Sequence, residues 1–263
     1  MICRYLAVLA ACVFLLSPAA GAEVVVNEVA YEHQETVLKG FMVQDTSFSG
    51  QRPGVLVVHE WWGLNDYVLM RARQLARMGY RAFAADMYGQ GRSTDDPNVA
   101  GQWAGHLRGS PLMRARAVAG LEQLRRHELV DPERLAAIGF CFGGTTVLEL
   151  AYSGADLRGV VSFHGGLSPL KEEDREKLTA KLLVLHGSED PLIKPEAIDL
   201  FQERLEVAEA DWQMISYGGA VHSFSNPKAG DDPSDGVAYD PAAARRSWKH
   251  MQLFFEEIFS GHE

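Results

Sequence analysis

The chain is poor in cysteine, in clustered positive charge and in long apolar segments. It has 3 cysteines in 263 residues, and its 35 acidic residues outnumber its 25 basic ones, giving a formal net charge of −10. Nucleic acid and anionic membrane surfaces are bound through basic patches, so neither is an expected partner. Repeats, low-complexity segments and linker-like tracts are also missing from the sequence. We therefore expect one large domain with a deep core.

The main apolar segment lies at the N-terminus. Residues 5–16 are apolar, Arg4 is the only charge near them, and residues 20–22 read Ala-Gly-Ala, a small-residue cleavage pattern. The run is short for a membrane span. We predict a signal peptide over residues 1–22, followed by a single domain over residues 23–263.

This prediction implies an exported protein, periplasmic or secreted, without stable membrane association after cleavage before Glu23. Two alternatives stay open. One is an uncleaved N-terminal membrane anchor. The other is lipoprotein processing at Cys12, which is less favoured because the apolar core continues to Leu16.

Signal cleavage would leave Cys141 as the single thiol, because Cys3 and Cys12 lie in the removed segment. Export implies an oxidising compartment, yet a lone cysteine cannot form an intramolecular disulfide. An unpaired thiol is a liability there unless it is buried or used, so the count favours a function for Cys141.

Two short strands are expected first, over residues 22–31 and 35–45, as an antiparallel pair at a sheet edge. Beyond them, short apolar runs typical of strands covered on both faces alternate with segments of helical periodicity. The expected strands are 54–59, 81–85, 134–138, 159–163, 181–185 and 212–217, and the expected helices are 67–78, 111–127, 145–151, 195–207 and 241–260. This alternation predicts an α/β fold, with a mainly parallel central sheet and helices on both faces.

Residues 139–144 read Gly-Phe-Cys-Phe-Gly-Gly between an expected strand and helix. Gly-x-nucleophile-x-Gly at such a junction is the form of a nucleophile elbow, a turn tight enough to strain the backbone and to need glycine on each side. A buried cysteine beside packing glycines is the alternative explanation of this motif taken alone.

Several reactive side chains directly follow expected strands, so they should meet at the edge formed by the strands' carboxyl ends. The chain order Cys141, Asp190, His222 matches the nucleophile, acid and histidine of α/β-hydrolases. Glu189 competes with Asp190. The competitors of His222 are His59, His164 and His186.

Each assigned role has a chemical reason. Cys141 needs a base to remove its proton, which His222 supplies, and Asp190 would hold the imidazole in one tautomer. The backbone N–H groups of Phe142 and Trp61 are candidate donors to the oxyanion. Glu60 follows the first central strand, and a carboxylate there could tune the thiol.

Aromatic residues near these positions predict an aromatic pocket, with ordinary core packing as the alternative; they are Trp61, Trp62, Phe142 and Trp103. The histidines lack the spacing of a metal site, and no phosphate-binding glycine loop is found. We expect neither a metal nor a cofactor.

The chain closely resembles the dienelactone hydrolase (carboxymethylenebutenolidase) family of α/β-hydrolases. The motifs that carry the resemblance lie at residues 59–63, 86–88, 139–144, 186–190 and 222–224, and the likeness covers essentially the whole mature chain. It implies a cofactor-free hydrolase of a small ester or lactone, acting through a Cys141–His222–Asp190 triad and a thioester intermediate. It also implies that Glu60 pairs with the resting thiol and helps deprotonate it when substrate arrives.

The sequence departs from the family at the substrate. Members active on dienelactone hold its carboxylate with two arginines, and the matching positions here are Gln90 and Asn226. Arg92 is a candidate replacement for the first, and Trp62 and Tyr88 are further expected pocket residues. An amide does not replace a bidentate arginine. The resemblance therefore implies the type of reaction, but it does not carry over the dienelactone substrate.

Alternatives remain at the level of function and assembly. A thioesterase or peptidase would use the same triad, and a binding protein could keep the fold without catalysis. The expected partner is a small-molecule ester or lactone, and the chain would act as a monomer or a homodimer.

Overall fold

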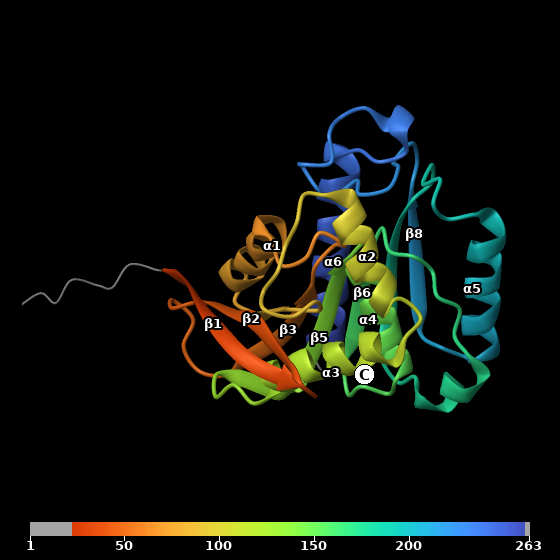
Figure 1. The fold of residues 1–263 in the computed structure, drawn as a ribbon. Helices are drawn as coiled ribbons and strands as arrows, with labels where there is room; N and C mark the ends of the chain where they lie inside the picture. Colours follow the sequence, from red (N-terminus) through yellow and green to blue (C-terminus); the bar gives the residue numbers. More distant parts are fainter. Residues whose placement is uncertain (1–22, 261–263) are drawn as a thin grey trace, which may run out of the picture.

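The computed structural model describes residues 23–260. Residues 1–22, and the signal peptide predicted for them, lie outside the described residues, so that peptide stays a prediction. An eight-stranded sheet with strand order β1-β2-β4-β3-β5-β6-β7-β8 runs through the molecule (Figure 1). Its strands are β1 (Val24–His33), β2 (Thr36–Asp45), β3 (Arg52–Val58), β4 (Arg81–Ala85), β5 (Val130–Phe140), β6 (Gly159–Phe163), β7 (Lys181–Gly187) and β8 (Trp212–Tyr217).

The sheet is mainly parallel. The β1–β2 and β2–β4 pairs are antiparallel, and every pairing from β4 through β8 is parallel. Both the parallel centre and the antiparallel edge pair were predicted from the sequence, and both are confirmed. The helices are α1 (Asp66–Arg77), α2 (Pro97–Leu107), α3 (Pro111–Arg125), α4 (Phe142–Tyr152), α5 (Pro195–Val207) and α6 (Pro241–Phe259). Short 3-10 helices span Glu172–Lys177 and Pro233–Asp235.

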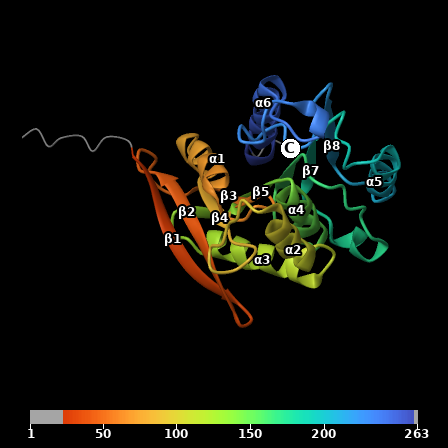
Figure 2. The same ribbon diagram turned by 45° about the horizontal axis from the view of Figure 1, so that its top comes forward.

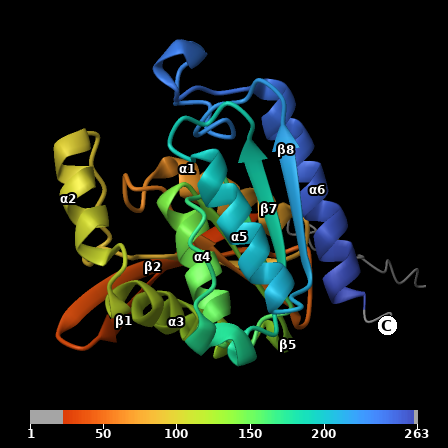
Figure 3. The same ribbon diagram turned by 90° about the vertical axis from the view of Figure 1, so that its right-hand side faces the viewer.

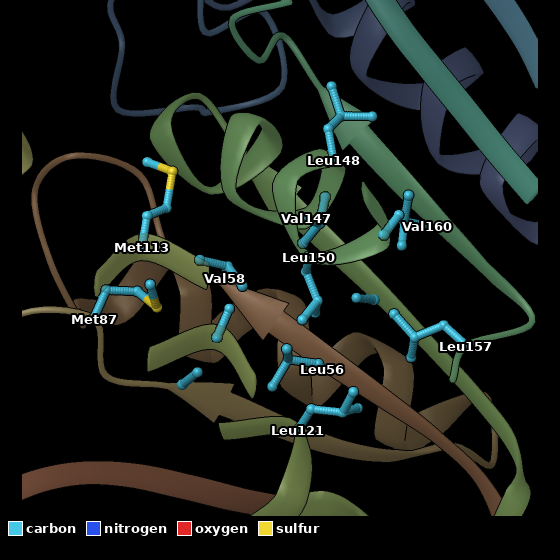
Figure 4. Packing of buried hydrophobic residues seen from close by; sticks show 14 of the residues in the cluster. Leu56, Val58, Met87, Met113, Leu121, Val147, Leu148, Leu150, Leu157 and Val160 are labelled. Atoms are coloured by element: carbon cyan, nitrogen blue, oxygen red, sulfur yellow. The ribbon is translucent and has the colours of Figure 1, made fainter. Parts of the chain in front are cut away.

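Helices cover both faces of the sheet, which makes a three-layer sandwich. α1 and α6 lie on one side, and α3 and α4 on the other (Figure 2). Strand β3 shows why its sequence is continuously apolar. Val55 and Val57 pack in the cluster with α1 and α6, whereas Leu56 and Val58 pack with α3 and α4 (Figure 4). Successive strand side chains point to opposite faces, so both sets must be apolar.

Helix α2 was not predicted. It begins after Asp96, whose side chain accepts a hydrogen bond from the Asn98 N–H (2.8 Å). Its buried positions are Ala100, Ala104 and Leu107, which give too weak an apolar periodicity to register. It stands at the margin of the molecule, away from α5 and α6 (Figure 3). The Asp-Pro pair at its start was the signal that could have revealed it.

Several bounds also differ from expectation, and the largest shifts are at the starts of β5 and α4. β5 begins at Val130 rather than residue 134, because residues 130–131 pair with β3 before a register shift at Pro53/Gly54. Helix α4 begins at Phe142 rather than residue 145, since the turn at Cys141 leaves no loop between strand and helix.

The turn at Cys141 depends on close backbone packing. Cys141 has φ 53° and ψ −114°, the strained geometry expected of an elbow. A Cβ on Gly139 would lie 2.0 Å from the Gly143 carbonyl oxygen, and a Cβ on Gly143 would lie 2.3 Å from that of Val58. The start of α4 therefore rests directly on the end of β3, and only glycine permits this approach.

We expect Gly143→Ala to lower the free energy of unfolding by about 2 kcal/mol or more, because the added methyl meets backbone that cannot move aside. Gly105→Ala is the matched control. Gly105 is exposed in α2 with open space around it. The Gly105→Ala variant should have a free energy of unfolding about 0.5–1 kcal/mol higher than the parent, because alanine lowers the entropy of the unfolded chain. Urea unfolding followed by circular dichroism measures both. Equal stability of Gly143→Ala and the parent would contradict the tight contact.

Candidate active site

Three side chains from three strand ends form one hydrogen-bonded chain. Cys141 follows β5, Asp190 lies just beyond β7, and His222 lies in the loop after β8. His222 Nε2 is 3.1 Å from Cys141 Sγ, and His222 Nδ1 is 2.8 Å from Asp190 Oδ2. All three residues are buried. The structure thus brings together the three residues that the sequence singled out for these roles.

The charge of His222 is set by its two neighbours. Burial alone would lower its pKa, but the hydrogen bonds to Asp190 and Cys141 and their negative charges raise the pKa to about 10. The imidazolium is therefore the favoured form of His222 at neutral pH. This pKa lies above the usual 6.5, so protonation of His222 stabilises the folded protein. That contribution to the free energy of unfolding is complete below about pH 6.5 and is lost as the pH rises through about 10.

The competing residues occupy other places. Glu189 is exposed, whereas Asp190 both faces His222 and accepts the Leu192 N–H (2.9 Å), so it also starts the turn. His164 is buried with Nε2 2.7 Å from Ser225 Oγ. Among residues 23–260, His222 is the one imidazole within hydrogen-bond distance of the Cys141 thiol. His186 is buried near the end of β7, and it is hydrogen-bonded to neither Cys141 nor Asp190.

Glu60 is buried and is held by the loop that carries His222. Ser223 Oγ donates to its Oε1 (3.2 Å), and Asn226 Nδ2 donates to its Oε2 (2.6 Å). Burial raises the pKa of Glu60, while the bonds from Asn226 and Ser223 and the positive charge of His222 oppose the rise. The described residues show no hydrogen bond between Glu60 and Cys141, so the thiol pairing implied by the family resemblance is not formed here.

Two backbone amides, those of Phe142 and Trp61, are the candidate oxyanion donors. Phe142 opens α4, so its N–H has no carbonyl acceptor within the helix. The ring of His59 orients the Glu60–Trp61 peptide. His59 Nδ1 donates to the Glu60 carbonyl (2.5 Å), and His59 Nε2 accepts a hydrogen bond from the Met87 N–H (3.3 Å). These bonds assign the neutral tautomer of His59, and burial lowers its pKa.

Tyr88 holds the next peptide along. Its hydroxyl donates to the Trp61 carbonyl at 2.9 Å. The carbonyls of Glu60 and Trp61, one in each peptide on either side of the Trp61 Cα, therefore both accept a hydrogen bond from a side chain. In a trans peptide the N–H points away from its carbonyl, and the described residues contain no cis bond. The N–H of Trp61 is therefore directed away from the ring of His59.

A cavity of about 640 Å³ opens on Cys141. It is lined by Trp61, Trp62, Asn65, Asp95, Arg108, Cys141, Leu192, His222, Ser223, Asn226, Lys228, Ala229 and Val237. The predicted pocket residues Trp61, Trp62 and Asn226 are among these.

The expectation that Tyr88 and Arg92 line this cavity is wrong. The Tyr88 hydroxyl is used on the Trp61 carbonyl. Arg92 donates to the carbonyls of Tyr88 and Gly89, and its guanidinium lies 4.8 Å from the ring of Trp103. Arg92 is thus tied to its own loop and does not replace a substrate-binding arginine. Trp103 packs against Tyr88 and is absent from the cavity lining as well.

Sequence reasoning missed the charged residues at the cavity. Asp95 and Arg108 lie just before and just after α2, and Lys228 lies in the loop after β8. The first two would have followed from recognising α2. Loop conformation alone brings Lys228 to the cavity, so no periodic signal marks it.

Within residues 23–260, no group of three or more His, Cys, Asp or Glu side chains is placed to hold a metal ion. In the same part of the chain we find no helix with the length and apolar character needed to span a membrane.

Comparison with known proteins identifies the family of this chain. Residues 38–259 match the model of the dienelactone hydrolase family. The chain belongs to the dienelactone hydrolase family. It is accordingly a hydrolase with an α/β-hydrolase fold, as predicted from its motifs.

Individual relatives cover most of the chain. The solved structure named m3DLH is 44% identical, with a TM-score of 0.86, and the match covers 90% of this chain and 99% of that one. A dienelactone hydrolase-like promiscuous phosphotriesterase, P91 from metagenomic libraries, is 41% identical with the same TM-score of 0.86 and the same coverage, 90% and 99%. Protein usf of Aquifex pyrophilus is 27% identical, over 79% of this chain and 89% of its own.

We expect Asp190→Asn to lower the pKa of His222 from about 10, because the hydrogen bond and the negative charge of the carboxylate both raise it. NMR titration of the His222 ring protons measures the change. Glu189→Gln is the matched control, since Glu189 is the exposed neighbouring carboxylate. Similar shifts in the two variants would show that Asp190 is not the specific partner.

Proposed function

We propose that this dienelactone hydrolase family member hydrolyses small-molecule esters or lactones through a Cys141 thioester. The single observation that carries the proposal is the chain of hydrogen bonds from Cys141 through His222 to Asp190 at a nucleophile elbow. A thiol, an imidazole and an orienting carboxylate in this order are the parts of nucleophilic acyl transfer.

The proposed reaction has two halves. The Cys141 thiolate attacks the ester carbonyl carbon, and the N–H groups of Phe142 and Trp61 donate hydrogen bonds to the oxyanion. Collapse breaks the bond to the alcohol oxygen, which takes the proton held by His222. Water then attacks the thioester, His222 removes its proton, and the acid leaves as the thiol is restored. Asp190 keeps the imidazole oriented in both halves.

Glu60 has a supporting role in this proposal. Its charge lies close enough to His222 for the two to shift each other's protonation, so a charged Glu60 favours the imidazolium and, through it, the thiolate. Asn226 donates a neutral hydrogen bond to Glu60, whereas an arginine there would neutralise the charge.

The substrate is less constrained than the reaction. Asn226 is occupied by Glu60, and Gln90 is exposed in a turn with φ 60°. Neither supplies the two-arginine carboxylate clamp. A substrate panel should therefore include lactones, carboxylic esters and acyl thioesters. It should also include a phosphotriester, the chemistry named for P91.

Cys141→Ala should abolish hydrolysis of p-nitrophenyl acetate, since it removes the attacking atom. We expect a loss of at least about a thousandfold in kcat/KM. Iodoacetamide treatment of the parent should have the same effect, and a short incubation with an acyl donor should give a mass increase confined to Cys141. Full activity in Cys141→Ala would overturn the triad, and a protein inactive on the whole panel would favour a non-catalytic binding role.

His59→Leu should lower kcat for ester hydrolysis by about tenfold to a hundredfold, because the Trp61 amide loses the group that orients its peptide. Alkylation of Cys141 by iodoacetamide should stay at the parent rate, since this displacement forms no oxyanion. His59→Asn keeps a donor near the Nδ1 position and should recover most of the activity. A parallel fall in alkylation and hydrolysis would instead indicate general damage to the site.

A further inference from the structure

Cys141 lies at the junction of two cavities. Beside the first, of about 640 Å³, a second of about 540 Å³ extends between α4 and the loop around residues 166–169. Four residues line both, namely Arg108, Cys141, Leu192 and His222. The nucleophile and its base are therefore open to space on two sides.

The second cavity offers mainly apolar surface. Its lining includes Met113, Phe142, Leu167, Pro169 and Ile193. Two polar side chains of its wall, Thr145 and Glu149, are engaged within the protein.

Thr145 Oγ1 donates to the Gly166 carbonyl (3.1 Å), and the Glu149 carboxylate is paired with Arg114 (2.7 Å). The remaining polar side chains are Arg108 and His222, at the junction with the first cavity, and Ser168. The rest of the wall is mainly apolar, so a hydrocarbon group is the best-matched occupant of this cavity.

The first cavity differs in character. Trp61 and Trp62 lie with ring centroids 4.7 Å apart at its wall, and Asp95 and Lys228 add polar groups. Aromatic faces with a few polar groups suit a ring or a moderately polar substituent.

We propose that the second cavity binds a hydrocarbon arm of the substrate while the first binds its other, aromatic or more polar arm. The preferred substrate class is then an ester with two sizeable arms. This inference rests on the proposed function, because it assumes that the scissile carbonyl sits at Cys141.

Size and geometry both support the two-armed substrate. Pockets of about 300–1,000 Å³ are typical of drug-sized ligands, so a single small lactone ring would fill only part of either cavity. A carbonyl carbon attacked at Cys141 also carries its acyl substituent and its leaving group in different directions. Leu192 is 63% exposed while lining both cavities, so an apolar substrate would cover a side chain that water now meets.

The test fills each cavity separately with the same side chain. Ser168 lines only the second cavity and Ala229 only the first, and both are small and half-buried. The variants are Ser168→Trp and Ala229→Trp. Leu253→Trp, on the exposed side of α6, is the control for a new tryptophan at a distance.

The substrates are p-nitrophenyl acetate and p-nitrophenyl octanoate, which share the aromatic arm and differ in the hydrocarbon arm. The readout is the ratio of their kcat/KM values, octanoate over acetate. Ser168→Trp should lower this ratio about tenfold or more, because the octanoyl chain loses its cavity. Ala229→Trp should reduce both values and keep the ratio within about twofold, because the shared ring loses its cavity. Leu253→Trp should leave both values unchanged.

An unchanged octanoate-to-acetate ratio in Ser168→Trp, or a fall of that ratio by about tenfold in Ala229→Trp, would overturn the proposal. Thermal melts and iodoacetamide alkylation at the parent rate show that each variant is folded with a reactive thiol. Cys141→Ala separates the two levels of inference. Activity surviving in that variant contradicts the proposed function itself, whereas activity lost there with an unchanged ratio in Ser168→Trp contradicts only the two-armed substrate.

Discussion

The contact between the start of α4 and the end of β3 is the constraint on which the site depends. Gly143 leaves its backbone against the Val58 carbonyl, closer than any side chain would allow. This approach brings the Phe142 amide next to the loop that carries Trp61, and it presents Cys141 above the sheet edge. The geometry of the reacting groups is thus fixed by backbone packing, which varies less than side-chain contacts do.

The electrostatics of the site depend on ionisable side chains that are buried around the elbow. Asp190, Glu60, His222 and Arg71 are buried ionisable side chains. Arg71 donates to the Ser225 carbonyl (2.6 Å) and lies over aromatic rings, so a guanidinium is accommodated without a direct carboxylate partner. Its positive charge opposes the rise in the pKa of Glu60. The loop from His222 to Asn226 is therefore contacted by the Arg71 guanidinium, and it also makes the hydrogen bonds to Glu60.

The sequence was informative where a residue's place follows from strand periodicity. Cys141, Asp190 and His222 come just after parallel strands, so the topology alone put them at one edge, and the structure confirms that they meet there. Prediction failed where loop conformation decides the direction of a side chain. Arg92 is close to the site in sequence, but its guanidinium satisfies carbonyls of its own turn. Helix α2 was missed because its buried face is built of small residues.

The elbow also divides the chain into parts that can and cannot vary. Strand passes to helix at Cys141 with no intervening residue to lengthen, so an insertion there would displace thiol and amide together. The cavity walls come instead from loops after β3, β4, β7 and β8. Of these, the segment from Asp95 to Arg108 after β4 carries no triad residue, and it can change without disturbing the sheet. Evolution or an engineer can therefore alter what this enzyme accepts through the segment from Asp95 to Arg108, while its reacting groups stay where they are.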